Sequence, residues 1–324
     1  MSAIAHARGA AMSRVLVTGA NGYIGRALAA RLKERLQAQE IESLTLLDLG
    51  FDHAPTEAGI RCISGDLGDA ACLAQATEPA PTVVFHLAGI MSRQAEEDFA
   101  LGMLVNVSCT IGLFERLRAL GHRPVVVYAS SIGVYGTPLP DAIDDDTPTA
   151  PALSYGAQKR MIEILLADYS RRGWVDGRAV RLPGVVARPA APNGALSAFS
   201  SDLIREPAEG RRYTCPIGPE GSMWLLSLPA CVDNLLHAAA IAPDRLPAGR
   251  AWNLPALRAT AAEIVQALCR RFGPDLAQRV EYRPVAGMQA QFAQWPPLAT
   301  PIGDFLGFRH DGNLDTLIER ALEA

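Results

Sequence analysis

The fold of this chain is decided by the stretch Arg14-Val15-Leu16-Val17-Thr18-Gly19-Ala20-Asn21-Gly22-Tyr23-Ile24-Gly25. Residues 14–18 are apolar and β-branched, which predicts a buried strand, and residues 24–37 have the apolar spacing of an amphipathic helix. The turn between them carries three glycines. Glycine permits a sharp turn, a close approach to a pyrophosphate and tight packing of the helix on the strand, and the helix N-terminus then faces the anion. This context predicts a dinucleotide-binding turn rather than a turn that binds nothing.

The alternation of short apolar strands and helices continues beyond this turn. Further strands are expected at 44–48, 61–64, 82–86, 125–129 and 179–182, and a further helix at 155–172. Continuous apolar strands that alternate with helices form a parallel sheet covered on both faces. The sequence therefore predicts an α/β fold with a doubly wound parallel sheet, a Rossmann fold.

The domain organisation follows from a change in composition near Pro183. Prolines and glycines become frequent over 183–221, and short elements replace the regular alternation. We expect a flexible tail at 1–12, an NAD-binding Rossmann domain at 13–182 with returning segments near 223–256, and a smaller C-terminal substrate lobe at 183–222 and 257–324. Such a lobe is expected over the carboxyl ends of the strands, where open parallel sheets bind ligands.

Composition excludes several classes of function. The 324 residues are 49% hydrophobic and carry a net charge of −4, so we expect a folded protein without the basic stripe that binds nucleic acid. The six cysteines lack Cys-x-x-Cys spacing and the six histidines are dispersed, which argues against a metal site. Because no secretion signal is recognised and no apolar run approaches the roughly 20 residues of a membrane helix, we expect a cytoplasmic protein without a membrane partner.

Two acidic residues follow the second and third strands. Asp48 stands 23 residues after Gly25 and ends its strand, where a carboxylate can bind ribose hydroxyls and repel a 2′-phosphate. The residues that follow, Leu49-Gly50-Phe51, include no arginine to bind such a phosphate. Both features predict NAD rather than NADP. Asp66 follows the third strand. It could contact the adenine or only cap a helix, and the sequence leaves both readings open.

A tyrosine and a lysine stand one helical turn apart. Only two of the thirty basic residues are lysines, and one of them, Lys159, follows Tyr155 by four positions. Residues at i and i+4 share a helix face, so the compact ammonium can lie near the phenol. A nearby cation favours phenolate and lowers the tyrosine pKa. The pair predicts that Tyr155 is a general base.

Together with the glycine turn and Tyr155-x-x-x-Lys159, a series of motifs resembles the extended short-chain dehydrogenase/reductases over most of the chain. The further motifs are His86-Leu87-Ala88-Gly89, Asn106 and Ser130-Ser131-x-x-Val134-Tyr135-Gly136. The resemblance implies that Ser131, rather than Ser130, holds the substrate hydroxyl and that Tyr155 transfers its proton. It implies that Lys159 binds nicotinamide ribose and tunes the phenol, and that Asn106 helps to order the active-site water and helix.

The implied cofactor is NAD. Its expected contacts are Gly19, Asn21, Gly22, Tyr23, Ile24, Gly25, Asp48, Asp66, Leu67, Leu87, Ala88, Gly89, Tyr155, Lys159, Pro183 and Val185. His86 itself is expected to be a satisfied buried histidine, and the tryptophans at 224, 252 and 295 are expected in the core or between lobes rather than at the substrate.

The substrate is indicated by shorter stretches. Residues 223–229 depart from the Arg-Asp-Phe/Tyr-like stretch of members that act on nucleotide sugars. Residues 154–159, 168–173 and 224–227 resemble the D-erythronate dehydrogenases of the family, which oxidise a four-carbon sugar acid at C2 to 2-oxo-tetronate with NAD.

The expected substrate contacts are Ser92, Ser131, Tyr155 and Asn193, although Ser92 and Asn193 also suit ordinary loop caps. Arg188 and Arg205 could clamp a carboxylate, but a structural role is preferred for both.

Two other functions remain open on the same fold. One is a sugar-nucleotide epimerase or dehydratase, which retains its NAD through the cycle, and the other is a non-catalytic NAD-binding regulator. The intact set of Ser131, Tyr155 and Lys159 argues against the regulator, because a sensor has no need of a tuned phenol. The family resemblance suggests a homodimer formed through helices near 95–120 and 155–172.

Overall fold

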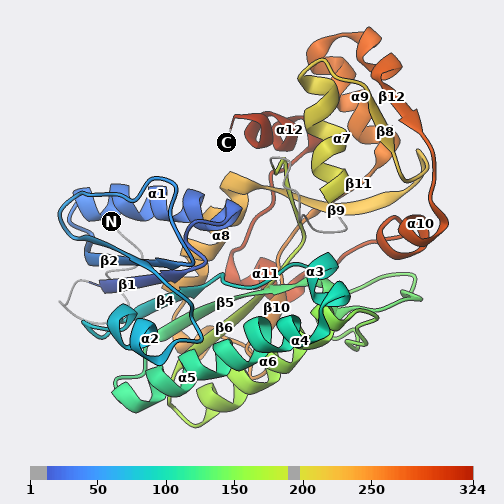
Figure 1. Cartoon of the computed structure of the whole chain (residues 1–324). Helices are drawn as coiled ribbons and strands as arrows, with labels where there is room; N and C mark the ends of the chain where they lie inside the picture. The colour runs from blue at the N-terminus through green and yellow to red at the C-terminus, as the bar shows by residue number, and fades with distance from the viewer. Residues whose placement is uncertain (1–12, 189–197, 324) are drawn as a thin grey trace. The chain divides into compact units, whose positions relative to one another are not determined.

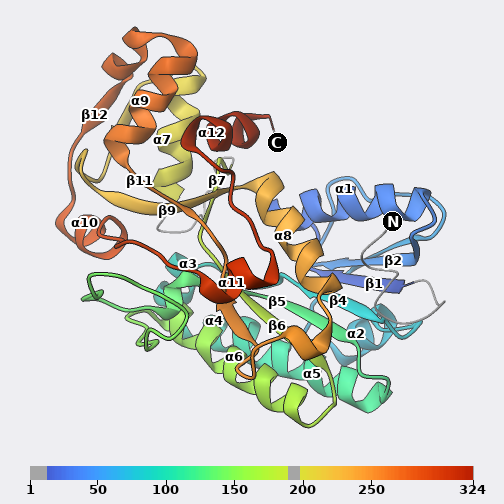
Figure 2. The ribbon, with the colours of Figure 1, turned by 180° about the vertical axis from the view of Figure 1, so that it is seen from behind.

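The computed structural model describes residues 13–188 and 198–323 and divides them into two compact units. The first unit contains residues 13–131, Leu153–Arg181 and Val232–Trp252, and the second contains Ile132–Ala152, Leu182–Cys231 and residues 253–323. Both units are drawn in Figure 1 and, from behind, in Figure 2.

The first unit is built on a seven-stranded sheet in the order β10-β6-β5-β4-β1-β2-β3. The strands are β1 Ser13–Thr18, β2 Ile41–Asp48, β3 Ile60–Ser64, β4 Val83–His86, β5 Val125–Ser131, β6 Asp176–Leu182 and β10 Ala251–Asn253. The pairings of β1 with β2 and β4, of β2 with β3 and of β4 with β5 are parallel. The order 3-2-1-4-5-6 is that of dinucleotide-binding folds. The predicted doubly wound sheet is confirmed.

Helices cover this sheet on both faces. They are α1 Tyr23–Gln37, α2 Ala70–Ala76, α3 Ser92–Glu97, α4 Phe99–Gly102, the π-helical turn η2 Met103–Ser108, α5 Cys109–Leu120, α6 Ser154–Arg171, α8 Leu228–Ala240 and the 3-10 turn η5 Pro243–Arg245. Helices α2, α5 and α6 lie on one face, and α1 and α8 lie on the other (Figures 1 and 2). Leu16 and Val126 from the sheet pack with Phe114 and Ile162 in one apolar core. The apolar residues of the strands therefore pack against the apolar faces of the helices.

One helical stretch is more apolar than the sequence analysis anticipated. The 22 residues Phe99–Leu120 reach a mean hydropathy of 1.3 over their most apolar window, which is enough to cross a membrane by length and composition alone. Leu113, Phe114 and Leu117 of this stretch are buried in the core beneath the sheet. Packing against the sheet therefore accounts for part of its apolar character.

The second unit has two small sheets. Strands β7 Gly184–Val186, β9 Ser222–Ser227 and β11 Leu257–Thr260 form one in the order β11-β9-β7, and β8 Tyr213–Cys215 pairs with β12 Val280–Tyr282 in the other. The helical elements are η3 Ile132–Val134, α7 Phe199–Ala208, α9 Ala261–Phe272, η6 Pro274–Arg279, α10 Ala286–Phe292, α11 Pro301–Leu306 and α12 Leu314–Leu322. Its core includes Leu203, Leu225, Ile264 and Leu317.

The division differs from the expected domains mainly at residues 132–152 and 223–231, which were expected in the first domain and belong to the second unit. The physical reason for the first is long-range pairing, because the Tyr135 hydroxyl lies 3.1 Å from the Asn253 amide oxygen. The reason for the second is that β9 pairs with β7 and β11. Residue 182 and residues 253–256 differ in the same direction.

The tryptophans are core residues, as predicted. Trp224 packs on Trp295 with ring centroids 4.7 Å apart, and its indole nitrogen donates to the Pro296 carbonyl at 2.7 Å. Trp252 is fully buried.

Candidate active site

The turn between β1 and α1 needs glycine for steric reasons. Gly19 has a φ of +71°, and a Cβ built on it would lie 2.6 Å from the Ala88 nitrogen. A Cβ on Gly25 would lie 2.0 Å from the Gly19 carbonyl oxygen. Gly22 caps α1, which has no side-chain cap hydrogen bond and no acidic residue in its first turn. The helix N-terminus, where Tyr23 and Ile24 begin the first turn, therefore fits an anion such as a pyrophosphate.

Asp48 lies beside this turn at the carboxyl end of β2. One carboxylate oxygen accepts a hydrogen bond from the Asn21 N–H and the other from the Leu49 N–H, both at 2.8 Å. A carboxylate offers about four acceptor positions, so each oxygen keeps one that suits a ribose hydroxyl. The neighbouring β4 end is held by a bond from the Leu87 N–H to the Thr18 carbonyl at 3.1 Å.

Asp66 does not cap a helix. Its carboxylate accepts from the Gly68 N–H at 2.8 Å and closes a turn after β3, whereas Asp69 caps α2 by accepting from the N–H groups of Ala71 and Cys72. The cap reading is therefore wrong, and the adenine contact stays a prediction. Leu67 packs in the apolar core of the first unit.

Tyr155 and Lys159 share one face of α6, as predicted. The Lys159 Nζ lies 5.5 Å from the Tyr155 ring centroid and 4.8 Å from that of Tyr128. The same atom donates to the Ala129 carbonyl at 2.9 Å. Burial lowers the pKa of Lys159 to about 8, against the opposing influence of the Glu163 carboxylate. The ammonium therefore carries its charge at neutral pH beside the phenol.

The two serines at the end of β5 have different surroundings. Ser130 is buried and donates to the Glu163 carboxylate at 2.6 Å. Successive residues of a strand point to opposite faces, so Ser131 does not follow Ser130 into this network. Ser131 is half-buried. The hydrogen bond to Glu163 gives Ser130 a structural role, and the role of Ser131 as the substrate contact stays a prediction.

Glu163 was not singled out by the sequence. It is buried one turn after Lys159 and is paired with Arg181 through two contacts of 3.0 Å and with Arg160 at 2.9 Å. Its charge holds the pKa of Lys159 above the value that burial alone would impose. The position of Glu163, four residues after Lys159 on the same helix, could have predicted that the two charges lie close together.

Asn106 lies in the π-helical turn η2 and holds the loop after β4. Its side-chain oxygen accepts from the Ile90 N–H at 2.9 Å, and its nitrogen donates to the Ile90 carbonyl at 3.2 Å. The same nitrogen donates to the Gln158 side-chain oxygen at 2.7 Å. A Cβ on Gly89 would approach the Asn106 oxygen to 2.9 Å, so this loop rests directly on Asn106.

His86 is a satisfied buried histidine, as predicted. Thr110 donates its hydroxyl to the Asn106 carbonyl, so the His86 Nε2, 2.8 Å from that hydroxyl, is the donor of their bond. Nδ1 then accepts from the Thr18 hydroxyl at 2.7 Å. Burial, followed by the charge of Lys159, lowers the pKa of His86 to about 3, which keeps the ring neutral. The histidine therefore joins β1, β4 and α5 structurally.

The structure describes some of the expected substrate contacts but not all of them. Ser92 is buried at the start of α3 in the first unit, whereas Asn193 lies outside the described residues. Of the expected NAD contacts, Pro183 and Val185 belong to the second unit, where β7 pairs with β9. Arg205 is paired with Asp202 and Glu206, which supports its structural reading.

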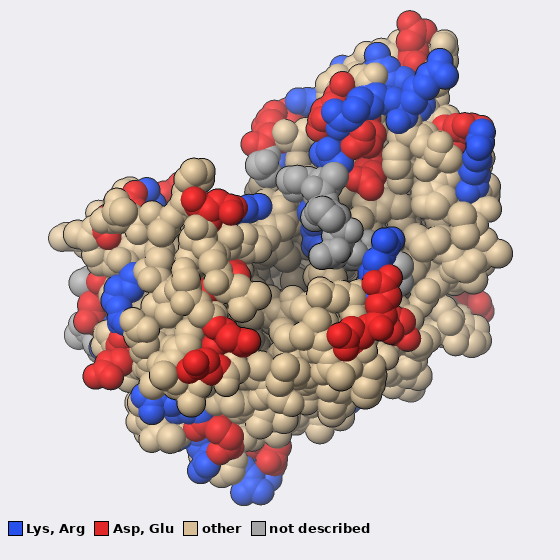
Figure 3. Space-filling view, viewed as in Figure 1, with Lys and Arg blue, Asp and Glu red and all other residues tan. Residues whose placement is uncertain are grey.

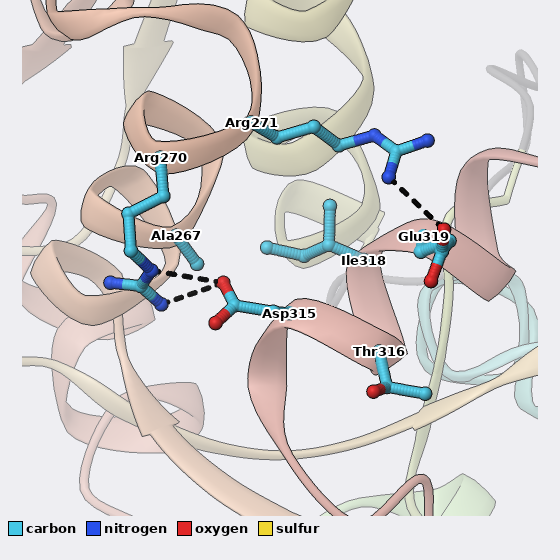
Figure 4. A pocket seen from close by; sticks show the side chains of 7 residues that line it. All are labelled: Ala267, Arg270, Arg271, Asp315, Thr316, Ile318 and Glu319. Atoms are coloured by element: carbon cyan, nitrogen blue, oxygen red, sulfur yellow. Dashed lines mark hydrogen bonds and ion pairs between the residues drawn. The ribbon is translucent and has the colours of Figure 1, made fainter.

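A pocket in the second unit lies between α9 and α12. Its lining residues are Ala267, Arg270, Arg271, Asp315, Thr316, Ile318 and Glu319 (Figure 4). Arg270 pairs with Asp315 at 2.7 Å and Arg271 with Glu319 at 3.4 Å, so both arginines already have acidic partners. Acidic and basic side chains are also mixed on the face drawn in Figure 3. We therefore place the chemistry at the residues of the first unit.

The sheet order, the glycine turn, Asp48 at the end of β2, the Tyr155–Lys159 pair and Ser131 at the end of β5 define a short-chain dehydrogenase/reductase of the extended type. A family model described as the NAD dependent epimerase/dehydratase family matches residues 15–224, and the chain belongs to this family.

Two curated relatives are dehydrogenases. The chain is 43% identical to a D-erythronate dehydrogenase of Cupriavidus necator over 95% of this chain and 98% of the relative. It is 32% identical to a D-erythronate dehydrogenase of Haemophilus influenzae over 96% and 99% of the two chains. The predicted family, the enzyme class and NAD as the cofactor are confirmed: the chain is an NAD-dependent dehydrogenase.

Solved structures share the fold. A structure described as the nucleoside-diphosphate-sugar epimerase from Agrobacterium tumefaciens is 34% identical, with a TM-score of 0.90 over 97% of this chain and 94% of that chain. An L-threonine dehydrogenase from Clostridium difficile is 23% identical, with a TM-score of 0.84 over 97% and 98%, and supports the fold alone.

Proposed function

We propose that this enzyme oxidises the C2 hydroxyl of a small sugar acid, D-erythronate, to the corresponding 2-oxo acid. The observation that carries the proposal is the buried Lys159 ammonium 5.5 Å from the Tyr155 ring, with Ser131 at the end of the neighbouring strand β5. The names of the relatives at 43% and 32% identity support the choice of substrate.

In the proposed reaction, the chain's own residues hold the substrate and remove its proton. The Ser131 hydroxyl both donates and accepts, so it can follow an alcohol that becomes a ketone. The Tyr155 phenolate takes the proton of the C2 hydroxyl, and the Lys159 charge stabilises that phenolate before the transfer. NAD, when bound, supplies the hydride acceptor. Ser92 is proposed to add to this polar lining, and Asn193 stays an expectation from the sequence.

A second candidate is the epimerase chemistry of a nucleotide sugar. The observation in its favour is the 34% identical solved structure described as a nucleoside-diphosphate-sugar epimerase. The same tyrosine and serine would serve this reaction, but NADH would not accumulate because the cofactor returns to its starting state.

An initial-rate panel distinguishes the two candidates. With NAD, we expect NADH to form with D-erythronate or a close tetronate, and at a much lower rate with the uncharged sugar alcohol of equal length, which lacks a carboxylate to bind. The panel is read at 340 nm with tetronates, pentonates, their alcohols and UDP-hexoses. Conversion of a UDP-hexose without turnover of any sugar acid would replace the first candidate by the second.

We also propose that the enzyme is a homodimer through an apolar face of the first unit. This dimer face consists of Phe99, Leu104 and Ile111 from the Phe99–Leu120 stretch with Met161 and Ile164 of α6, all of them exposed large apolar side chains. Helices α4 and α6 are in contact, as are η2 and α6, so the two rows are neighbours. Contiguous exposed apolar surface of this kind marks an interface.

A charge in this face should separate the subunits. Ile164→Glu is expected to convert the dimer to a monomer, because it buries an unpaired charge in the interface. Light scattering after gel filtration measures the mass. Phe305→Glu is the matched control, since Phe305 is also an exposed large apolar residue but lies in the second unit. A monomeric wild-type protein at micromolar concentration would contradict the proposal.

A further inference from the structure

Gln158 is a polar side chain in a buried position. It lies on α6 between Tyr155 and Lys159 and is 1% exposed. Its side-chain oxygen accepts the hydrogen bond from Asn106 at 2.7 Å. The residue therefore joins the helix that carries the tyrosine and lysine to the π-helical turn that carries Asn106.

The orientation of its amide is forced by the backbone. The Ile90 N–H must meet the oxygen of Asn106 and the Ile90 carbonyl must meet its nitrogen. The Asn106 nitrogen therefore faces Gln158, which must present its own oxygen as the acceptor. Reversing the Gln158 amide would place two donors against each other.

This orientation leaves the other end of the Gln158 amide unpaired. Its Nε2 is buried and has no hydrogen-bond partner among the described residues. It packs against Gly102, where a Cβ would lie only 2.6 Å from that nitrogen. A buried unpaired donor destabilises a protein, so methionine, with nearly the same shape, would suit packing better. The hydrogen bond from Asn106 is therefore the contact that accounts for a glutamine here.

The loop that Asn106 holds also lies against the lysine. A Cβ built on Gly89 would be 2.9 Å from the Asn106 side-chain oxygen and 3.7 Å from the Lys159 Nζ. A displacement of Asn106 would therefore move the 89–90 loop relative to the Lys159 ammonium. From the α6 side, the Gln158 side-chain oxygen accepts a hydrogen bond from the Asn106 nitrogen at 2.7 Å.

We propose that Gln158 is a positioning residue for the reaction: through Asn106 it sets the 89–90 loop against Lys159 and Tyr155. The inference rests on the proposed function for its kinetic consequence, but the structural coupling of Gln158 to Ile90 is independent of the substrate. Small misplacements of reacting groups are costly, so removing the acceptor should affect turnover more than binding.

The test compares Gln158→Met with wild type and with Gln289→Met. We expect Gln158→Met to lower kcat with D-erythronate about 10- to 100-fold. KM and the NAD dissociation constant should stay within about threefold. Tm should change little, because the variant removes the unpaired Nε2 donor but also takes the Gln158 acceptor away from the Asn106 nitrogen. Gln289→Met, which removes a glutamine bond to the Gly218 N–H in the second unit, should keep kcat within about twofold. Gln158→Leu replaces the methionine variant if that variant does not fold.

A double-mutant cycle separates positioning from general damage. If Gln158 acts through Asn106, Asn106→Ala with Gln158→Met should be no slower than Asn106→Ala alone. Wild-type kcat in Gln158→Met, or additive losses in the double variant, would overturn the inference.

Amide exchange provides a readout that needs no substrate. The Ile90 amide should exchange at least about tenfold faster in Gln158→Met, because the Asn106 oxygen that protects it is no longer held. Unchanged Ile90 exchange would also overturn the inference. If wild type oxidises no sugar acid while Ile90 exchange accelerates in the variant, the substrate proposal fails and the coupling stands.

Discussion

Tyr155→Phe is expected to lower kcat with D-erythronate by about 10²- to 10⁴-fold, the usual contribution of a positioned general base. The phenylalanine ring keeps the packing of α6 and leaves the Lys159 ammonium in place, 5.5 Å from the ring centroid. It lacks only the phenolic oxygen, which accepts the proton when it is ionised. Initial rates with saturating NAD measure the loss. NAD titration of the same variant should show a dissociation constant close to that of wild type.

Substitutions of Lys159 test the same proposed chemistry. Lys159→Ala should be nearly as slow as Tyr155→Phe, and Lys159→Arg should not restore activity. The ammonium is 4% exposed and is enclosed by the rings of Tyr128 and Tyr155 and by the Ala129 carbonyl. A planar guanidinium has another shape and cannot occupy such a site as a point charge. Near-normal turnover in the phenylalanine variant would remove Tyr155 from the proposed chemistry.

NAD should be preferred over NADP by roughly 100-fold or more in kcat/KM, because a 2′-phosphate would meet the Asp48 carboxylate as a like charge. The carboxylate is held beside the glycine turn by the Asn21 and Leu49 N–H groups, so it cannot easily turn away. Asp48→Asn keeps an oxygen for one of these two donors and removes the charge. We expect this variant to have a higher kcat/KM with NADP, so that the ratio of kcat/KM between NAD and NADP becomes smaller.

Asp52→Asn is the matched control for this experiment. Asp52 is a highly exposed acid four residues further on, with its nearest ion pair to Arg26 at 3.8 Å. Its removal should leave the NAD preference intact, since an exposed charge is screened by water. Equal efficiency of wild type with both cofactors would show that Asp48 does not face the ribose.

The strands of the Rossmann sheet were predictable because their signals are local. The six strands recognised from their β-branched and apolar runs all begin and end within three residues of the predicted bounds. The division of the chain was less predictable. Residues 132–152 follow the last residue of β5 directly, but Tyr135 finds its partner at Asn253, more than one hundred positions later. No local pattern encodes a contact of that range.

In the candidate site too, some features follow from the local sequence and others depend on tertiary contacts. The sequence by itself determined the glycine turn, Asp48 at its strand end, and the Tyr155–Lys159 pair, because each depends on steric needs or helix periodicity within a few neighbouring residues. Only the tertiary structure decided that Ser130 donates to Glu163 and that Gln158 accepts from Asn106. Those roles depend on which donors and acceptors meet when separate elements pack. Burial then makes each hydrogen-bond choice obligatory, since an unmatched polar group cannot turn to water instead.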